Sequence, residues 1–143
     1  MWSGNPVDGP AFYSLLCTSD EFCAELGRAT LAAGRLESAL KQHVMCHARQ
    51  LDLAHATLGQ LIAVAKKENL LSEMIPPLEL LKSQRNYLAH NIHSLLSGTI
   101  IETILEGSNL IDSDVTTYTE RAWQLADNLN ALSEILERER ANL

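Results

Sequence analysis

The sequence predicts an all-α fold, a bundle of four to five helices, from two observations. Apolar residues make up 46% of the 143 residues and aromatic residues only 5%, so the core must be built mainly from Leu, Ile and Ala. Such a composition favours helices packed on helices over a β-sandwich. Apolar residues also recur at steps of three and four, the period of an amphipathic helix. A chain of this length suffices for one core, and we expect a single helical domain over residues 18–143.

The first long helix is predicted to begin at Ser19 or Thr18. Residues 1–17 contain two glycines and two prolines and are expected to form an irregular arm or a short leading turn. A hydroxyl side chain followed by two acidic residues is typical of a helix N-terminus, where unpaired N–H groups need acceptors. The spaced apolar residues then continue as far as Leu51.

Two further helices follow in the central part of the chain. Thr57 and Gln60 form the pattern of a capping box, which predicts a second helix. Pro76 and Pro77 end whatever precedes them, because the residue before a proline is pushed out of the helical region. Proline is favoured in the first turn of a helix, so a third helix is expected to start there and to carry "KSQRNYLAHNIHSL" (residues 82–95).

The last third of the chain is harder to interpret. Residues 94–113 are compatible with a short hairpin or with a frayed helix, and both alternatives stay open. Thr117 and Glu120 again have the spacing of a capping box. They predict that a last helix opens at Thr117, with apolar residues along one side.

The third helix has an arginine on its apolar side. At about 100° per residue, Arg85 falls inside the arc of Leu78, Leu81, Leu88, Ile92, Leu95 and Leu96. A charge there is costly unless it is paired or reaches water or a ligand. The alternatives are a stem that lies along apolar neighbours while the head reaches water, a carboxylate partner such as Glu37 or Glu79, and a functional role. A polar strip lies beside the arc, formed by Lys82, Asn86, His90 and His93.

The letters themselves favour a functional role. The stretch from Arg85 to His90 reads Arg-Asn-Tyr-Leu-Ala-His, an Arg-x4-His motif with a polar residue straight after the arginine. It resembles the HEPN superfamily (higher eukaryote and prokaryote nucleotide-binding domains), many of whose members are metal-independent endoribonucleases. One toxin branch of that family carries Tyr immediately before the motif histidine. Ala89 occupies this position here, which argues against regulation by modification of that tyrosine.

The resemblance implies a reaction and a set of roles. RNA would be cleaved by attack of a ribose 2′-hydroxyl on the adjacent phosphate, without a metal or other cofactor. His90 would act as general base or acid and Arg85 would bind the non-bridging oxygens. Asn86 would position the phosphate or orient His90, while Lys82 and His93 would hold the RNA backbone. The implied partners are an RNA substrate and a second copy of the chain, and an antitoxin or regulatory protein is a further candidate if the protein is a toxin or defence effector.

The spacing of the motif predicts a homodimer independently of the resemblance. Residues five apart on one helix point roughly 140° away from each other, so one helix cannot easily aim both Arg85 and His90 at one phosphate. Two copies related by a twofold axis can, because each supplies part of a shared site.

Charge and composition limit the other possibilities. The formal net charge of −7 argues against broad attraction to nucleic acid, so contact with phosphate must be made locally. This charge keeps open an alternative in which the chain is a catalytically silent HEPN-like module that binds RNA or a protein. No window approaches the roughly 18 apolar residues of a membrane span, and no leader segment is expected. The three cysteines are interpreted as small buried hydrophobic residues of a reduced cytoplasmic protein.

Two further features have a structural and a functional interpretation. His43 and His47 stand four apart and could chelate zinc on a helix, although packing in the core is the favoured interpretation because both fall on or near the apolar side. Trp123 lies off the apolar side of the last helix. It could mark a partner surface, but a single aromatic residue at a helix edge usually only packs.

Overall fold

The computed structural model describes residues 4–47, 51–97 and 111–141, and within these ranges the chain is all-α, as predicted. Apart from an isolated bridge between Pro6 and Ile111, no β-structure occurs in the described ranges. The elements are α1 (Gly9–Thr18), α2 (Asp20–His47), α3 (Leu58–Lys67), α4 (Ile75–Ser97), the 3₁₀ turn η2 (Asp112–Asp114) and α5 (Val115–Ala141).

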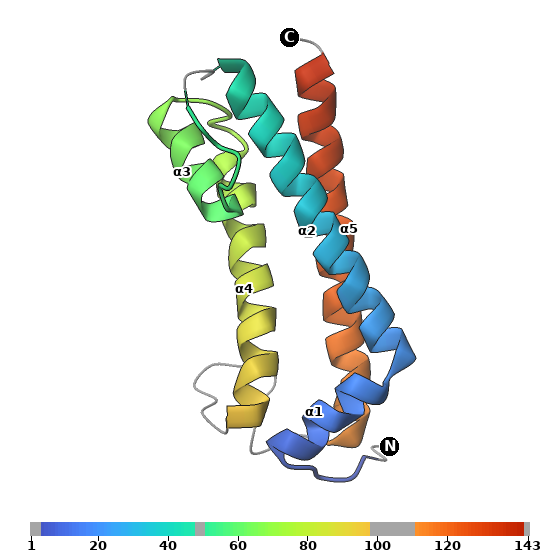
Figure 1. Ribbon diagram of the computed structural model, residues 1–143. Helices are drawn as coiled ribbons and strands as arrows, with labels where there is room; N and C mark the ends of the chain where they lie inside the picture. Colours follow the sequence, from blue (N-terminus) through green and yellow to red (C-terminus); the bar gives the residue numbers. More distant parts are fainter. Residues whose placement is uncertain (1–3, 48–50, 98–110, 142–143) are drawn as a thin grey trace.

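The two longest helices form the centre of the bundle (Figure 1). α2 and α5 lie side by side and run in the same direction, and α4 runs the opposite way beside them. α3 packs at the end of the bundle where α4 begins, and α1 lies across the other end. Within the described part of the chain, every helix falls short of the length or apolar content that a membrane span requires.

Small side chains allow α2 and α5 to approach closely. A run of alanines is buried where the two helices meet, and larger leucines fill the space on either side. The buried alanines are Ala29, Ala32, Ala33, Ala39, Ala122 and Ala126. The leucines buried completely on these two helices are Leu36, Leu40, Leu129 and Leu136.

A polar clamp joins α2 to α5 at the edge of this seam. Arg35 donates from Nε to Glu137 Oε1 and from Nη2 to Glu137 Oε2, both at 2.9 Å, and from Nη1 to Asn130 Oδ1 at 3.0 Å. The hydrogen bonds from Arg35 lower the pKa of the Glu137 carboxyl. Such a two-pronged pair fixes the axial register of one helix against the other as well as adding attraction.

The prediction of an irregular arm over residues 1–17 is wrong for most of that segment, because α1 occupies Gly9–Thr18. The Asp8 side chain caps this helix by accepting from the Ala11 N–H at 2.8 Å, and a proline in the first turn costs no hydrogen bond. Phe12 and Leu16, one turn apart, are buried in the core. This tertiary burial stabilises a helix too short to be stable alone.

The other helix starts agree with the sequence patterns except at α5. Ser19 caps α2, since its Oγ accepts from the Phe22 N–H at 3.1 Å. The capping box of Thr57 and Gln60 is confirmed, with both reciprocal hydrogen bonds present. Proline occupies the first turn of α4, as expected.

The last helix begins two residues earlier than predicted, at Val115 rather than Thr117. Asp114 Oδ2 accepts from the Ile111 N–H at 3.0 Å and closes the η2 turn, which leads directly into α5. Of the segment 94–113, residues 94–97 belong to α4 and residues 112–113 to η2. The choice between a hairpin and a frayed helix falls mostly on residues 98–110, which lie outside the described residues.

Among the described residues, Tyr118 has the largest side chain that is fully buried. Its ring makes edge contacts with Phe12 and Phe22, at centroid distances of 5.1 and 6.4 Å, and so links α5 to α1 and α2. No described residue forms a hydrogen bond with its hydroxyl. Burial raises the pKa of Tyr118 to about 12, so the hydroxyl stays protonated.

We predict that Tyr118→Phe leaves the free energy of unfolding unchanged or raises it by about 1 kcal/mol, because it removes a buried hydroxyl that has no partner. Tyr118→Ala removes the ring contacts and is expected to lower it by about 3–5 kcal/mol. Urea denaturation followed by circular dichroism measures both. A large loss of stability in Tyr118→Phe would show that the hydroxyl has a partner and contradict this account.

His43 packs into the seam between α2 and α5 and is 4% exposed. Its Nδ1 has no hydrogen-bond partner among the described residues, and the centroid of its ring lies 5.2 Å from that of His47. Burial, followed by repulsion from His47, lowers the pKa of His43; Arg140 adds to this shift and Glu139 opposes it.

A lowered pKa in the folded state means that the unfolded chain binds a proton more readily. The free energy of unfolding therefore decreases as the pH is lowered. We predict that the free energy of unfolding is constant above about pH 6.5, the ordinary pKa of histidine, and declines below it until the native-state pKa is reached. Urea denaturation between about pH 8 and pH 5 measures this decline. His43→Leu should weaken it, whereas His55→Gln, at an exposed position, should keep it. An identical decline in His43→Leu would assign the effect to other groups.

Candidate functional site on helix α4

Arg85 lies on the flank of α4 and is half-buried beside the buried side chains of Leu81 and Leu88. Its Nη2 donates to Asn86 Oδ1 at 3.4 Å, a long and weak contact. Neither an ion pair nor a second hydrogen bond of Arg85 occurs in the described residues. Glu79, one of the two carboxylates considered as its partner, instead accepts from Lys66 Nζ at 2.6 Å. Arg85 therefore has no carboxylate partner among the described residues.

Asn86 and His90 lie one turn apart on the exposed side of α4. Residues four apart on a helix are surface neighbours, so the amide of Asn86 is within reach of both motif residues. Ser83, Asn86 and His90 are exposed on this side of α4, and Leu80, Gln84 and Ala89 are exposed at positions further around the helix.

Of the two residues predicted to hold the RNA backbone, Lys82 and His93, the structure describes the side chain of Lys82 alone. Lys82 is half-buried, and its side chain passes over Gly59, where an added Cβ would lie 3.5 Å from Cδ and 3.6 Å from Nζ of the lysine. The Lys82 ammonium thus faces the first turn of α3, and Lys82 and His90 are separated by about 12 Å along the helix axis. His93 belongs to α4, but its side chain lies outside the described part of the structure.

One helix carries every residue of the predicted site, but it does not aim them at one point. Arg85 lies toward the core and His90 toward solvent, in agreement with the roughly 140° between them around the helix axis. Arg85 and Asn86 are in contact, whereas a phosphate held by Arg85 would need an imidazole from elsewhere.

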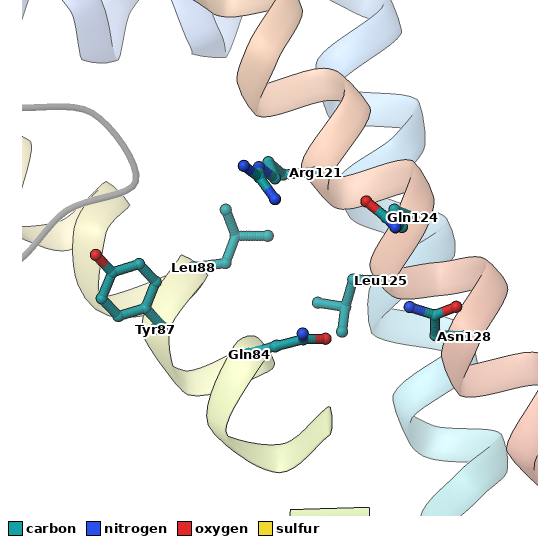
Figure 2. Close-up of a pocket in the computed structure, with 7 residues that line it drawn as sticks. All are labelled: Gln84, Tyr87, Leu88, Arg121, Gln124, Leu125 and Asn128. Carbon is teal, nitrogen blue, oxygen red and sulfur yellow. The ribbon is translucent and has the colours of Figure 1, made fainter. Parts of the chain in front are cut away.

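Sequence reasoning missed a cleft between α4 and α5 (Figure 2), which we name the α4–α5 cleft. Its volume is about 370 Å³. α4 contributes Gln84, Tyr87 and Leu88. α5 contributes Arg121, Gln124, Leu125 and Asn128. The spacing of three and four within each set marks one face of each helix, but nothing local in the sequence indicates that these two faces lie opposite each other.

The histidine and cysteine interpretations are revised by the structure. His43 is buried as expected, but His47, also expected on the apolar side, is exposed. No group of three or more potential metal ligands occurs in the described ranges. The expectation that the three cysteines are buried is wrong, because Cys17, Cys23 and Cys46 are all exposed and unpaired. They lie on the outward-facing sides of α1 and α2, where the helical period places them.

Comparison with known proteins gives no match: no family model, no curated protein and no solved structure is similar to the chain. The resemblance to the HEPN superfamily stays a prediction from the Arg-x4-His motif.

Proposed function

We propose that the protein is a metal-independent endoribonuclease of HEPN type, with a composite site in the cleft of a homodimer. Arg85 and Asn86 of one protomer would act together with His90 of its partner. A role as a toxin or defence effector fits an RNA-cutting activity of this kind.

The observation that carries the proposal is the state of Arg85. Arg85 is half-buried as a residue, its hydrogen bond to Asn86 lies at the exposed surface, and no carboxylate of the described residues neutralises its charge. A guanidinium that no neighbouring carboxylate neutralises keeps its full attraction for an anion. Its planar fork matches the two non-bridging oxygens of a phosphate. The carboxylate-partner alternative has lost support, and a guanidinium that merely reaches water is the remaining structural alternative.

The exposed side of α4 supports pairing with a second copy. Leu80 is 57% exposed on α4, and the small residue Ser83, about one turn further on, allows another helix to approach closely. In a dimer of two α4 helices related by a twofold axis, we expect His90 of each protomer to meet Arg85 of the other. Each site is then complete only in the dimer.

The reaction proposed for this site is transesterification. His90 accepts the proton of the ribose 2′-hydroxyl while a bond forms between that oxygen and the adjacent phosphorus. The bond from phosphorus to the 5′-oxygen breaks, and a proton returned to that oxygen leaves a cyclic phosphate and a free 5′-hydroxyl. Imidazole suits this exchange because its ordinary pKa of about 6.5 is close to neutral pH. Arg85 stabilises the charge that grows on the non-bridging oxygens.

The net charge of −7 favours a second candidate function. A strongly acidic chain repels nucleic acid at long range, so a HEPN-like module without turnover, which binds a protein or a specific RNA, is the alternative. It predicts a stable complex with a partner and no cleavage of any RNA by purified protein.

We predict that purified protein cuts RNA in the presence of EDTA and that Arg85→Ala and His90→Ala each lower the rate by about 10² to 10⁴. Loss of the proton carrier or of the phosphate-binding cation removes stabilisation of the transition state. Gel-based cleavage of labelled RNA measures the rate. Light scattering and circular dichroism check that the dimer and the fold persist.

Arg138→Ala and His55→Ala serve as matched controls, because both side chains are exposed and lie on other elements, α5 and the segment before α3. They should cut at the wild-type rate. Wild-type activity in Arg85→Ala or His90→Ala would overturn the proposed roles, and absence of cleavage by the wild type would favour the alternative.

A further inference from the structure

We propose that the α4–α5 cleft binds one base of single-stranded RNA next to the phosphate that is cleaved. This inference rests on the proposed function and deepens it, because it gives the protein a means of choosing where RNA is cut. None of the residues that line the cleft belongs to the Arg-x4-His pair.

The position of the cleft relative to the motif is the first argument. Tyr87 lines the cleft and lies three residues before His90, so their Cβ atoms are about 5–6 Å apart on the helix surface. Gln84, which also lines the cleft, directly precedes Arg85 in the sequence. Around the axis of α4, Tyr87 lies between the cleft and His90, since successive residues advance by about 100°. A base held in the cleft would therefore leave its own sugar and phosphate near the imidazole.

The chemistry of the lining is the second argument. Gln84, Gln124 and Asn128 present three carboxamides, each of which is both a hydrogen-bond donor and an acceptor. The donor and the acceptor of one carboxamide match the edge of a nucleobase, where an acceptor and a donor lie side by side. In the described part of the chain, none of these amides has a hydrogen-bond partner. They are available to a ligand.

Apolar and aromatic surface complete the cleft. Leu88 and Leu125 are buried, at 4% and 5% exposure, and form its floor, where the face of a base can rest. Figure 2 shows Gln84 and Leu88 extending from α4 toward α5, with the ring of Tyr87 at the α4 edge. Aromatic rings are the usual stacking partners of unpaired RNA bases.

The charge of the residues that line this cleft differs from that of the chain as a whole. The chain has 18 Asp and Glu residues, but no carboxylate is among the described residues that line the cleft. Arg121, which lines it from α5, forms no ion pair within the described ranges. A lining that combines, in its described residues, amides with one free cation and no acid suits a ligand that joins a neutral ring to an anion, as a nucleotide does.

A protein partner fits the same cleft less well. Stable protein–protein contacts need a wide face with an apolar centre, whereas the only apolar side chains that line this cleft in the described residues are two leucines that are already buried. We therefore favour RNA, and binding of a protein alone is one of the outcomes that the test can return.

The test measures binding rather than cutting. The probes are four hexanucleotides, each a run of A, C, G or U, with every 2′-hydroxyl methylated so that none can be cleaved. Fluorescence anisotropy gives the Kd for each probe with the wild-type protein. We expect the tightest and weakest probes to differ by at least about tenfold, and Gln124→Ala or Asn128→Ala to reduce that difference by about tenfold. Gln42→Ala, an exposed glutamine on α2, is the matched control and should keep the preference.

The role of Arg121 has its own readout. Arg121→Gln should lower the slope of log Kd against log salt concentration by about 0.7, because one phosphate contact is lost. Arg138→Gln, the same change at another exposed position of α5, should leave the slope unchanged. Gln124→Glu, which keeps the shape of the side chain but adds a negative charge, should weaken every probe.

The outcomes separate the two proposals. If the wild type binds the four probes equally, or if it binds only a protein, the cleft proposal is overturned whatever the cleavage assays show. If Gln124→Ala abolishes the preference but no RNA is cut, the cleft stands and the nuclease proposal fails. If RNA is cut at the same positions by wild type and Gln124→Ala, the nuclease proposal stands and the cleft proposal falls.

Discussion

The packing of α2 against α5 is the constraint on which the rest of the molecule depends. Alanines along the seam bring the two helices together over most of their length, and Arg35 fixes their register through Glu137 and Asn130. Because α2 and α5 pack against each other, α4 covers only one side of the pair and keeps one face toward solvent (Figure 1). A helix placed in this way can bury Leu78 and Leu88 while it presents His90. The exposed motif is a consequence of how the core is made.

Arg85 lies at the boundary between these two environments. A leucine there would extend the apolar arc of α4 and would be expected to pack at least as well, since burying a charge without a partner costs free energy. The chain keeps an arginine, and among the described residues its one hydrogen bond is the weak contact with Asn86. Residues that break a local folding rule without compensation are often functional. The same reasoning does not extend to Lys82, whose side chain packs over Gly59 and has a structural explanation.

Much of the fold could be predicted because periodicity and capping are local properties of a sequence. The starts of α2, α3 and α4 followed from such signals, which are the caps Ser19 and Thr57 and the Pro76–Pro77 pair. α1 was missed because its stability comes from the distant contacts of Phe12, in particular with Tyr118, and not from its composition. The start of α5 was misjudged because the η2 turn, which Asp114 closes by accepting from the Ile111 N–H, leads directly into the helix before Thr117. For the site, the spacing of Arg85 and His90 was enough to predict that the two side chains point to different sides of α4. The α4–α5 cleft could not be predicted, because it depends on which faces of two separate helices meet.

The central claim is that one active site takes its arginine from one protomer and its histidine from the other. Mixing Arg85→Ala protein with His90→Ala protein, after subunit exchange, tests this most directly. Neither variant alone retains a complete site, but a mixed dimer regains one, built from the intact arginine of one chain and the intact histidine of the other. Random pairing makes half of the dimers mixed, so cleavage should recover to about one quarter of the wild-type rate. No recovery, in a mixture in which exchange of subunits is demonstrated, would contradict the shared site.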